Sequence, residues 1–315
     1  MQLDAERFSL VRDDGQWLEN LVGADGESRL LTSTSEIARS LQRQFAPSAA
    51  NALTLPWPDV HELVRFLPGK TTIWSGPTFS GKTQFLRQLM LWALKNGQRV
   101  FFASLEEEPL EVFREFIATC AHRRDSPAQF VEDCLDLWDE RLFVFDSTEM
   151  IAPERLLGLV QFAAKKYAIT HVVIDSLMRL AIASDDYEGQ RQMGNLISRV
   201  ARLAGVHIHL VAHPRKTLNS RQSMDLYDIR GAQDLVAQAD SVVTLERKHG
   251  NDRHCDAELT IWKQRGDINW IGAIRLHYDH ASRQLKYRAC DAPMRFISDE
   301  AYEVMSSQRR LSHAT

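Results

Sequence analysis

Short apolar runs alternate with longer amphipathic stretches from residue 70 onward. Apolar positions that recur every three or four residues predict helices at 82–95, 109–122, 153–167 and 188–204. The apolar runs between them predict the strands Thr71–Ser75, Val100–Leu105, Arg141–Phe145, His171–Asp175 and His207–Ala212. Strands that alternate with helices indicate an α/β fold with a mainly parallel sheet flanked by crossover helices.

The pattern changes after residue 240, where strand-like runs follow one another without helices between them. These runs are 240–248, 257–265, 270–279 and 283–288. Strands joined without crossover helices pair antiparallel, so we expect them to extend the sheet as an antiparallel C-terminal edge.

The first 55 residues differ from the rest of the chain. Residues 7–28 are charged and rich in turn formers, which suits a small hairpin, and 33–45 has the periodicity of a helix. Prolines 47, 56 and 58 then interrupt the pattern. We therefore divide the chain into an N-terminal extension (1–55), a main α/β domain (56–290) and a C-terminal tail (291–315).

Composition excludes several classes of protein. The chain of 315 residues is 44% hydrophobic and 25% charged, with no apolar run long enough to span a membrane, which favours a cytoplasmic protein. Its four cysteines are widely spaced, which argues against a zinc ribbon and a disulfide framework. The net charge of −4 confines any contact with nucleic acid to a local basic patch.

The segment Gly76-Pro77-Thr78-Phe79-Ser80-Gly81-Lys82-Thr83 fits the phosphate-binding pattern G-x-x-x-x-G-K-[ST]. Its glycines let consecutive backbone N–H groups point at phosphate oxygens, and the helix that begins there adds the positive end of its dipole. Lys82 would reach the β- and γ-phosphates and the Thr83 hydroxyl would ligate Mg²⁺. The segment follows a predicted strand and begins a predicted helix, so we expect a site for ATP and Mg²⁺.

Two acidic positions complete a hydrolytic site. Asp175 ends an apolar strand, as a Walker B aspartate does, and would bind Mg²⁺ directly or through water. Glu106 is the first acid after the strand 100–105, which we expect to lie beside the strand that precedes the phosphate-binding segment. Glu106 could hold a water in line with the γ-phosphate. Glu107 and Glu108 could do so instead, or could begin the next helix, where its dipole favours acids.

A polar strand end and a basic segment follow. His213 ends the strand 207–212 and could hydrogen-bond the γ-phosphate, although a satisfied core histidine is the alternative. The residues from 214 to 221 carry three positive charges and no acids, a composition that suits a nucleic-acid backbone but also an ordinary solvated loop. Lys263 and Arg265 alternate on one face of a later strand, and could either reach a neighbouring subunit's nucleotide or form surface salt bridges.

Taken in order, these segments resemble the RecA-like motor domain of the DnaB/Twinkle family of hexameric replicative helicases, including the helicase half of phage primase–helicases. The resemblance covers residues 55–290 and rests on "FLPGKTTIWSGPTFSGKT", "VFFASLEEEP", "HVVIDSLMRL", "HLVAHPRK", "DIRGAQDLVAQADSVVTLERK" and "LTIWKQRGDINWIGAIRLHYD". It implies a bacterial, phage or plasmid protein that forms a ring, usually of six subunits. ATP would bind at the subunit interfaces and single-stranded DNA in the central channel.

The resemblance also implies roles for single residues. Glu106 matches the family's catalytic glutamate, Asp175 its Walker B aspartate and His213 its γ-phosphate sensor. Arg265 matches the arginine finger that acts in trans, with Lys263 beside it. The segment from Lys216 to Gly231 is similar to the channel loops that hold DNA, and the residues implied in DNA contact are Arg215, Lys216, Arg221, Arg230 and Gly231.

The chain also departs from the family. No zinc ribbon or primase-type acidic cluster precedes the motor, so we expect no primase activity, and 55 residues are too few for the helical collar of bacterial replicative helicases. The helix 33–45 could be a linker that docks on an adjacent subunit, or could fold onto its own domain. Other replication or recombination proteins are further expected partners. A RecA-like recombinase or recombination mediator, and an ATPase that acts on protein partners without DNA, are the alternative functions.

Overall fold

The computed structural model describes residues 52–146, 150–177, 187–213, 232–248, 255–266 and 268–303. The chain divides into two compact units, residues 1–50 and residues 51–315, and the described residues all belong to the second. The hairpin and the helix that the sequence predicts at 7–28 and 33–45 lie outside the described residues.

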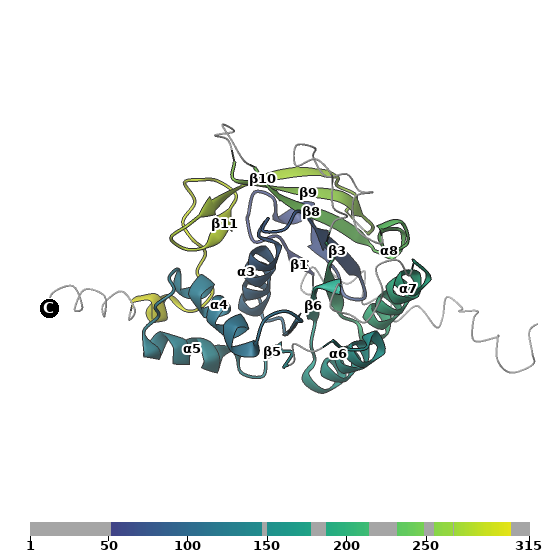
Figure 1. Ribbon diagram of the computed structural model, residues 1–315. Helices are drawn as coiled ribbons and strands as arrows, with labels where there is room; N and C mark the ends of the chain where they lie inside the picture. The colour runs from purple at the N-terminus through teal and green to yellow at the C-terminus, as the bar shows by residue number, and fades with distance from the viewer. Residues whose placement is uncertain are drawn as a thin grey trace, which may run out of the picture. The chain divides into compact units, whose positions relative to one another are not determined.

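A nine-stranded sheet forms the centre of the second unit (Figure 1). Its spatial order is β11-β10-β9-β8-β3-β7-β6-β4-β5. The strands are β3 (Thr71–Ser75), β4 (Val100–Ser104), β5 (Leu142–Val144), β6 (His171–Asp175), β7 (His207–Val211), β8 (Ser241–Arg247), β9 (Ala257–Gln264), β10 (Gly272–Asp279) and β11 (Gln284–Lys286). Strands β3 to β8 pair in parallel, and β9, β10 and β11 continue the sheet antiparallel. The predicted α/β class, with its mainly parallel sheet and antiparallel edge, is confirmed.

Two predictions about neighbouring strands are wrong. Strand β4 does not lie beside β3, because β7 and β6 stand between them. Strand β8 pairs in parallel with β3, so the antiparallel edge begins one strand later than expected. In both cases the helix that precedes the strand carries the chain across the sheet, and the order along the chain does not fix the order in the sheet.

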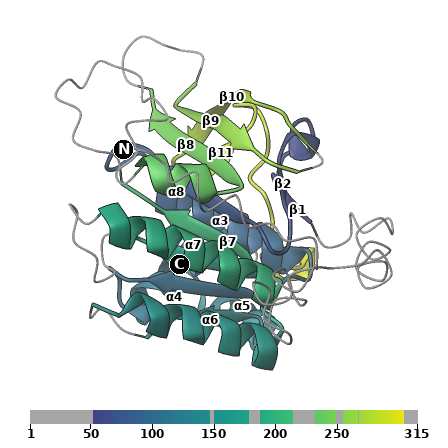
Figure 2. The ribbon, with the colours of Figure 1, turned by 90° about the vertical axis from the view of Figure 1, so that its right-hand side faces the viewer.

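Helices cover both faces of the sheet (Figures 1 and 2). On one face lie α3 (Lys82–Lys95), α4 (Pro109–Ala121) and α5 (Ala128–Trp138), and on the other α6 (Pro153–Tyr167), α7 (Tyr187–Ala204) and α8 (Ala232–Gln238). The central strands are buried on both sides, which explains their nearly continuous apolar sequence. Along β4, for example, Phe102 packs with α3 and α4 while Phe101 and Ala103 pack with α6.

The ends of the described unit also join this core. A short hairpin of β1 (Leu53–Thr54) and β2 (Arg65–Phe66), with the 3₁₀ helix η4 (His61–Leu63) between them, buries Trp57 and Phe66 in the cluster around α3. Beyond residue 291, Phe296 and Tyr302 are buried in the same cluster, and the Tyr302 hydroxyl donates to the Cys120 carbonyl at 2.7 Å. Within the described residues, no helix combines the length and the apolar character that crossing a membrane requires.

Candidate nucleotide-binding and hydrolysis site

The turn between β3 and α3 has the backbone that the phosphate-binding pattern requires. Gly76 has φ 146° and Gly81, the residue before α3, has φ 95°, both in the region that favours glycine. A Cβ at position 76 would lie 2.1 Å from the Leu245 carbonyl oxygen, so a larger residue cannot occupy this turn unchanged. Phe79 at the tip is 88% exposed. The turn therefore lies open to a ligand at the carboxyl edge of the parallel strands.

Lys82 lies inside this turn. Its ammonium group donates to the carbonyl oxygens of Gly76 and Pro77, each at 2.8 Å, and contacts the Ser80 hydroxyl at 3.4 Å. Burial lowers the pKa of Lys82 to about 8, against the opposing influence of Asp175. A phosphate group in the turn would favour the charged form, because it would place negative charge beside the ammonium.

Thr83 and Asp175 bring the two predicted metal-binding groups together. The Thr83 hydroxyl donates to Asp175 Oδ2 at 2.6 Å, which joins the first turn of α3 to the end of β6. Burial raises the pKa of Asp175, and the nearby Glu106 raises it further, whereas the hydrogen bond from Thr83 lowers it. A buried carboxylate beside a hydroxyl is a donor set that Mg²⁺ accepts, and its positive charge would offset this burial.

The three consecutive glutamates after β4 have different surroundings. Glu106 accepts a hydrogen bond from the Ser176 hydroxyl at 3.2 Å, next to Asp175. Glu107 accepts from the Ser104 hydroxyl at 3.3 Å and forms an ion pair with Arg87. Glu108 is the residue immediately before α4. Glu106 and Glu107 thus both face the same space, although β4 lies several strands from β3, because the carboxyl ends of parallel strands share one edge of the sheet.

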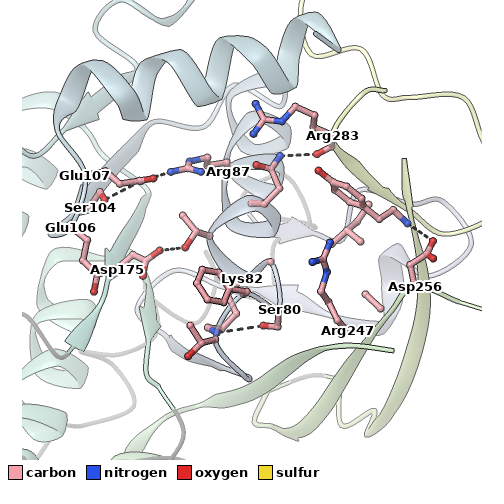
Figure 3. Close-up of a pocket in the computed structure, with 18 of the residues that line it drawn as sticks. Ser80, Lys82, Arg87, Ser104, Glu106, Glu107, Asp175, Arg247, Asp256 and Arg283 are labelled. Carbon is pink, nitrogen blue, oxygen red and sulfur yellow. Dashed lines mark hydrogen bonds and ion pairs between the residues drawn. The ribbon is translucent and has the colours of Figure 1, made fainter. Parts of the chain in front are cut away.

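This space is a cavity of about 720 Å³ (Figure 3). The cavity wall includes residues 78–84 together with Glu106, Glu107, Asp175 and His213. His213 is half-buried just beyond β7. The candidate phosphate-binding, metal-binding, base and sensor residues come from β3–α3, β4, β6 and β7, and all of them except Gly76 and Pro77 line one cavity.

The opposite wall of the cavity was not anticipated from the sequence. It includes Arg247 at the end of β8, Asp256 before β9 and Arg283 between β10 and β11, all labelled in Figure 3. Tyr278, near the end of β10, also lines the cavity. The Arg247 guanidinium lies 6.0 Å from the centre of the Tyr278 ring, and Asp256 accepts from the Tyr278 backbone N–H at 2.9 Å. An aromatic face, a cation and a carboxylate suit a nucleoside. The predicted strand runs contained Arg247, Tyr278 and Arg283, but only the sheet order brings these residues opposite the phosphate-binding turn.

Lys263 and Arg265 lie at the opposite end of the sheet from the cavity, where the parallel strands β3 and β8 begin. Lys263, near the end of β9, donates to the Val236 and Ala237 carbonyl oxygens of α8 at 2.5 and 3.0 Å. Burial lowers its pKa to about 8, and the nearby Arg265 adds to this effect. Arg265 follows the strand, and its side chain is exposed. The irregularity in the pairing of β8 with β9 falls at Trp262, just before Lys263, and beyond it Lys263 and Gln264 pair in one register with Val242 and Ser241.

Backbone contacts fix this location. The Arg265 N–H donates to the Asp240 carbonyl at 2.8 Å, and the Asp240 N–H donates to the Thr71 carbonyl at 3.1 Å. Thr71 begins β3, whereas the phosphate-binding turn follows its last residue, and a strand of this length spans roughly 16 Å. Neither Lys263 nor Arg265 is among the described residues that line the cavity.

A comparison with known protein families shows to which family the chain belongs. The family model described as the AAA domain matches residues 39–219, which is more than half of the 315 residues. The chain belongs to the AAA domain family. Its phosphate-binding turn, Asp175 and Glu106 all lie within the matched range, so membership covers the part of the cavity that would carry out ATP hydrolysis.

Solved structures agree on the fold of this AAA domain. One of them, itself an ATPase domain, superposes with a TM-score of 0.68 at 18% sequence identity, over 81% of this chain and 98% of that one. A DnaB-like replicative helicase, solved in a study of its interactions with primase, superposes with a TM-score of 0.67 at 15% identity, over 86% of this chain and 73% of that one. The AAA domain therefore has the RecA-like fold of DnaB-like ATPase domains.

The residues implied in DNA contact belong to one segment. Arg215, Lys216, Arg221, Arg230 and Gly231 all lie outside the residues that the structure describes. The structure describes the two ends to which this segment is joined, His213 at the cavity and α8 beside Lys263.

Proposed function

We propose that the chain is an ATP-hydrolysing motor of the DNA-helicase type, which translocates on single-stranded DNA and has no primase activity. The observation that carries the proposal is the convergence of Lys82, Thr83, Asp175, Glu106 and His213 on one cavity, in a chain with the fold of DnaB-like ATPase domains. Binding of a nucleoside triphosphate needs only the phosphate-binding turn and Lys82. Hydrolysis also needs a carboxylate for the metal ion and one that orients water, and Asp175 and Glu106 would supply them at the ends of two further strands.

Binding of the triphosphate would use groups that already face the cavity. Lys82 would exchange its two carbonyl partners for oxygens of the β- and γ-phosphates, which offer it a full opposite charge. Thr83 and Asp175 would hold Mg²⁺, which neutralises phosphate charge when bound. The start of α3 adds its backbone N–H groups and its dipole.

Hydrolysis would depend on Glu106. Its carboxylate lies at the end of β4, held by Ser176, and can orient a water toward the γ-phosphate. Positioned acid–base groups of this kind contribute about 10²- to 10⁴-fold to a rate. His213, from the end of β7, would hydrogen-bond the γ-phosphate and register its presence at the start of the segment 214–231.

The nucleoside would lie against the opposite wall. Arg247 and Tyr278 offer a cation and an aromatic face to the base, and the Asp256 carboxylate can accept hydrogen bonds from sugar hydroxyls. This assignment accounts for the extension of the cavity from the phosphate-binding turn to β10.

The proposed assembly is a ring, with six subunits as in the resembling family. Arg265 would act on the nucleotide of the neighbouring subunit, with Lys263 beside it. Its position at the sheet edge opposite its own cavity supports action in trans. Residues 214–231 would hold the DNA backbone, and hydrolysis would move them along one strand.

The decisive experiment is steady-state ATP hydrolysis by the full chain, with and without single-stranded DNA, over a series of salt concentrations. We expect stimulation by DNA that fades as salt rises, because contacts with the backbone release counterions, followed by unwinding of a forked duplex. Lys82→Ala is the control and should be inactive. Equal rates with and without DNA would instead support an ATPase that acts on protein partners. Filaments rather than closed rings in electron micrographs would support the recombinase class.

A further inference from the structure

Arg87 is a buried cation in the wall of the nucleotide cavity. It lies on α3, one helical turn beyond Thr83, and its side chain is only 6% exposed. The guanidinium forms an ion pair with Glu107 across the gap between α3 and the end of β4 (Figure 3). Burial of an arginine costs desolvation free energy unless a carboxylate compensates its charge, so the buried position of Arg87 depends on Glu107.

Three acids converge beside this arginine, and each accepts a hydrogen bond from a hydroxyl. Thr83 donates to Asp175, Ser176 donates to Glu106, and Ser104 donates to Glu107. Glu107 also accepts from the Arg87 guanidinium, and its side chain is 36% exposed. Without Arg87, Ser104 would remain as its neutral donor at 3.3 Å.

The ion pair joins the two elements whose relative position determines hydrolysis. Helix α3 carries Lys82 and Thr83, which would hold the phosphates and the metal ion. The turn after β4 carries Glu106, adjacent in sequence to Glu107. Strand β4 makes no direct pairing with β3, so sheet hydrogen bonds do not connect the two elements directly. Arg87 and Glu107 make that connection through side chains.

We propose that Arg87 is a positioning residue for ATP hydrolysis: through Glu107 it fixes the turn that carries Glu106 relative to the phosphate-binding start of α3. The inference rests on the proposed ATPase function and deepens it. Arg87 touches neither water nor phosphate in this role. The Nη2 group of its guanidinium donates to Glu107, whereas the buried Nε atom has no hydrogen-bond partner among the described residues.

The test compares Arg87→Leu with Arg87→Lys in the full chain. We expect Arg87→Leu to lower kcat about 10- to 100-fold, as loss of a group that orients a catalytic residue does. Its KM for ATP and its binding of a fluorescent ATP analogue should stay within about threefold of the parent chain, because Lys82 and Thr83 are intact. Arg87→Lys should recover part of kcat, since lysine keeps the charge. Arg114→Leu, which breaks an exposed ion pair on α4, is the matched control and should change nothing.

A double-variant comparison separates positioning from a merely structural role. In a chain that already carries Glu106→Gln, Arg87→Leu should cost little more in single-turnover hydrolysis, because the group it positions is gone. The inference would be overturned if the losses of activity in the two single variants added in full in the double variant. It would also be overturned if Arg87→Leu raised the KM for ATP about 10- to 100-fold and left kcat unchanged. If Arg87→Leu does not fold, Glu107→Gln decides: it breaks the ion pair but keeps an acceptor, and an unchanged kcat would contradict the proposal.

Failure of this inference is distinguishable from failure of the proposed function. If Lys82→Ala is inactive and Glu106→Gln hydrolyses ATP only slowly while Arg87→Leu keeps its kcat, the ATPase site stands and only the positioning role is wrong. If Lys82→Ala and Glu106→Gln both retain full hydrolysis, the proposed site itself is wrong.

Discussion

Tyr278 shows how much of the site depends on single side chains that carry no motif. Residues 76–83, Glu106 and Asp175 can be predicted from the sequence because strand ends and glycine spacing reveal them locally. Tyr278 and Arg247 have no such signal, since an aromatic or basic residue on an edge strand is ordinary. Only the pairing of β8, β9 and β10 brings them to the cavity of the phosphate-binding turn.

Tyr278→Ala should weaken ATP binding without affecting binding of the phosphates alone. Loss of a stacking face costs about 1–3 kcal/mol, so we expect the KM for ATP to rise about 10-fold with little change in kcat. Inhibition by inorganic tripolyphosphate, which has no base, should stay the same. Equal loss of both would show that Tyr278 supports the cavity rather than the nucleoside.

At the scale of elements, a strong hydrophobic periodicity was sufficient to predict the bounds of helices and strands whose apolar positions are buried in the core. Helix α3 and strands β3 and β6 have the predicted bounds. Helix α5 was missed although Phe130, Cys134 and Trp138 recur every four residues and are buried. Helix α8 has only seven residues, fewer than a reliable periodic signal needs. The neighbours of β4 and the direction of β8 depend on crossovers between distant segments, which no local pattern contains.

We expect Lys263 to stabilise the short helix α8. Lys263 donates to two of its last carbonyls, which complements the negative end of a short helix. Lys263→Met should increase amide hydrogen exchange in residues 232–240 by about 10-fold, because hydrogen bonds from charged groups contribute roughly 1.5–3 kcal/mol. Lys248→Met, which removes an ion pair with Glu258 elsewhere in the sheet, should leave that exchange unchanged. Unchanged exchange in Lys263→Met would show that α8 is held by its apolar contacts.

At the scale of the whole molecule, a buried histidine cluster should make folding sensitive to acid. Trp74 Nε1 donates to His209 Nδ1 at 3.1 Å, and His209 Nε2 lies 3.3 Å from His171 Nδ1. His207 contacts the Leu67 carbonyl and the Thr72 hydroxyl. Burial lowers the pKa of all three histidines, that of His207 to about 4. The Trp74 N–H can only donate, so a second proton at His209 Nδ1 would break its bond.

The native state therefore binds fewer protons than the unfolded chain between the ordinary histidine pKa of 6.5 and about 4. The contribution to stability is fully present above pH 6.5 and is lost as pH falls through this window, by about 3 kcal/mol for His207 alone. Urea unfolding at several pH values would measure this slope. His207→Gln should flatten it, whereas the exposed His280→Gln should not. An unchanged slope in His207→Gln would assign acid sensitivity to other groups.

Mixing two inactive variants tests whether the site is shared between subunits. Arg265→Ala should bind ATP but turn it over slowly, and Glu106→Gln should do the same for a different reason. In a mixed assembly some interfaces combine an intact Glu106 with an intact Arg265 from the neighbour, so part of the activity should return. Without such rescue in mixtures shown to co-assemble, Arg265 would not act across the interface.

Arg265 is joined through Asp240 to the first residue of β3, and this location has a consequence for how activity depends on the amount of protein. An arginine side chain is much shorter than the roughly 16 Å of strand that separates it from its own phosphate-binding turn. If Arg265 is the finger, an isolated chain can bind ATP but lacks a component of its site. Hydrolysis per chain should then fall upon dilution, in parallel with dissociation of the assembly measured by light scattering, while nucleotide binding persists. A rate per chain that is independent of concentration would mean that one chain is sufficient.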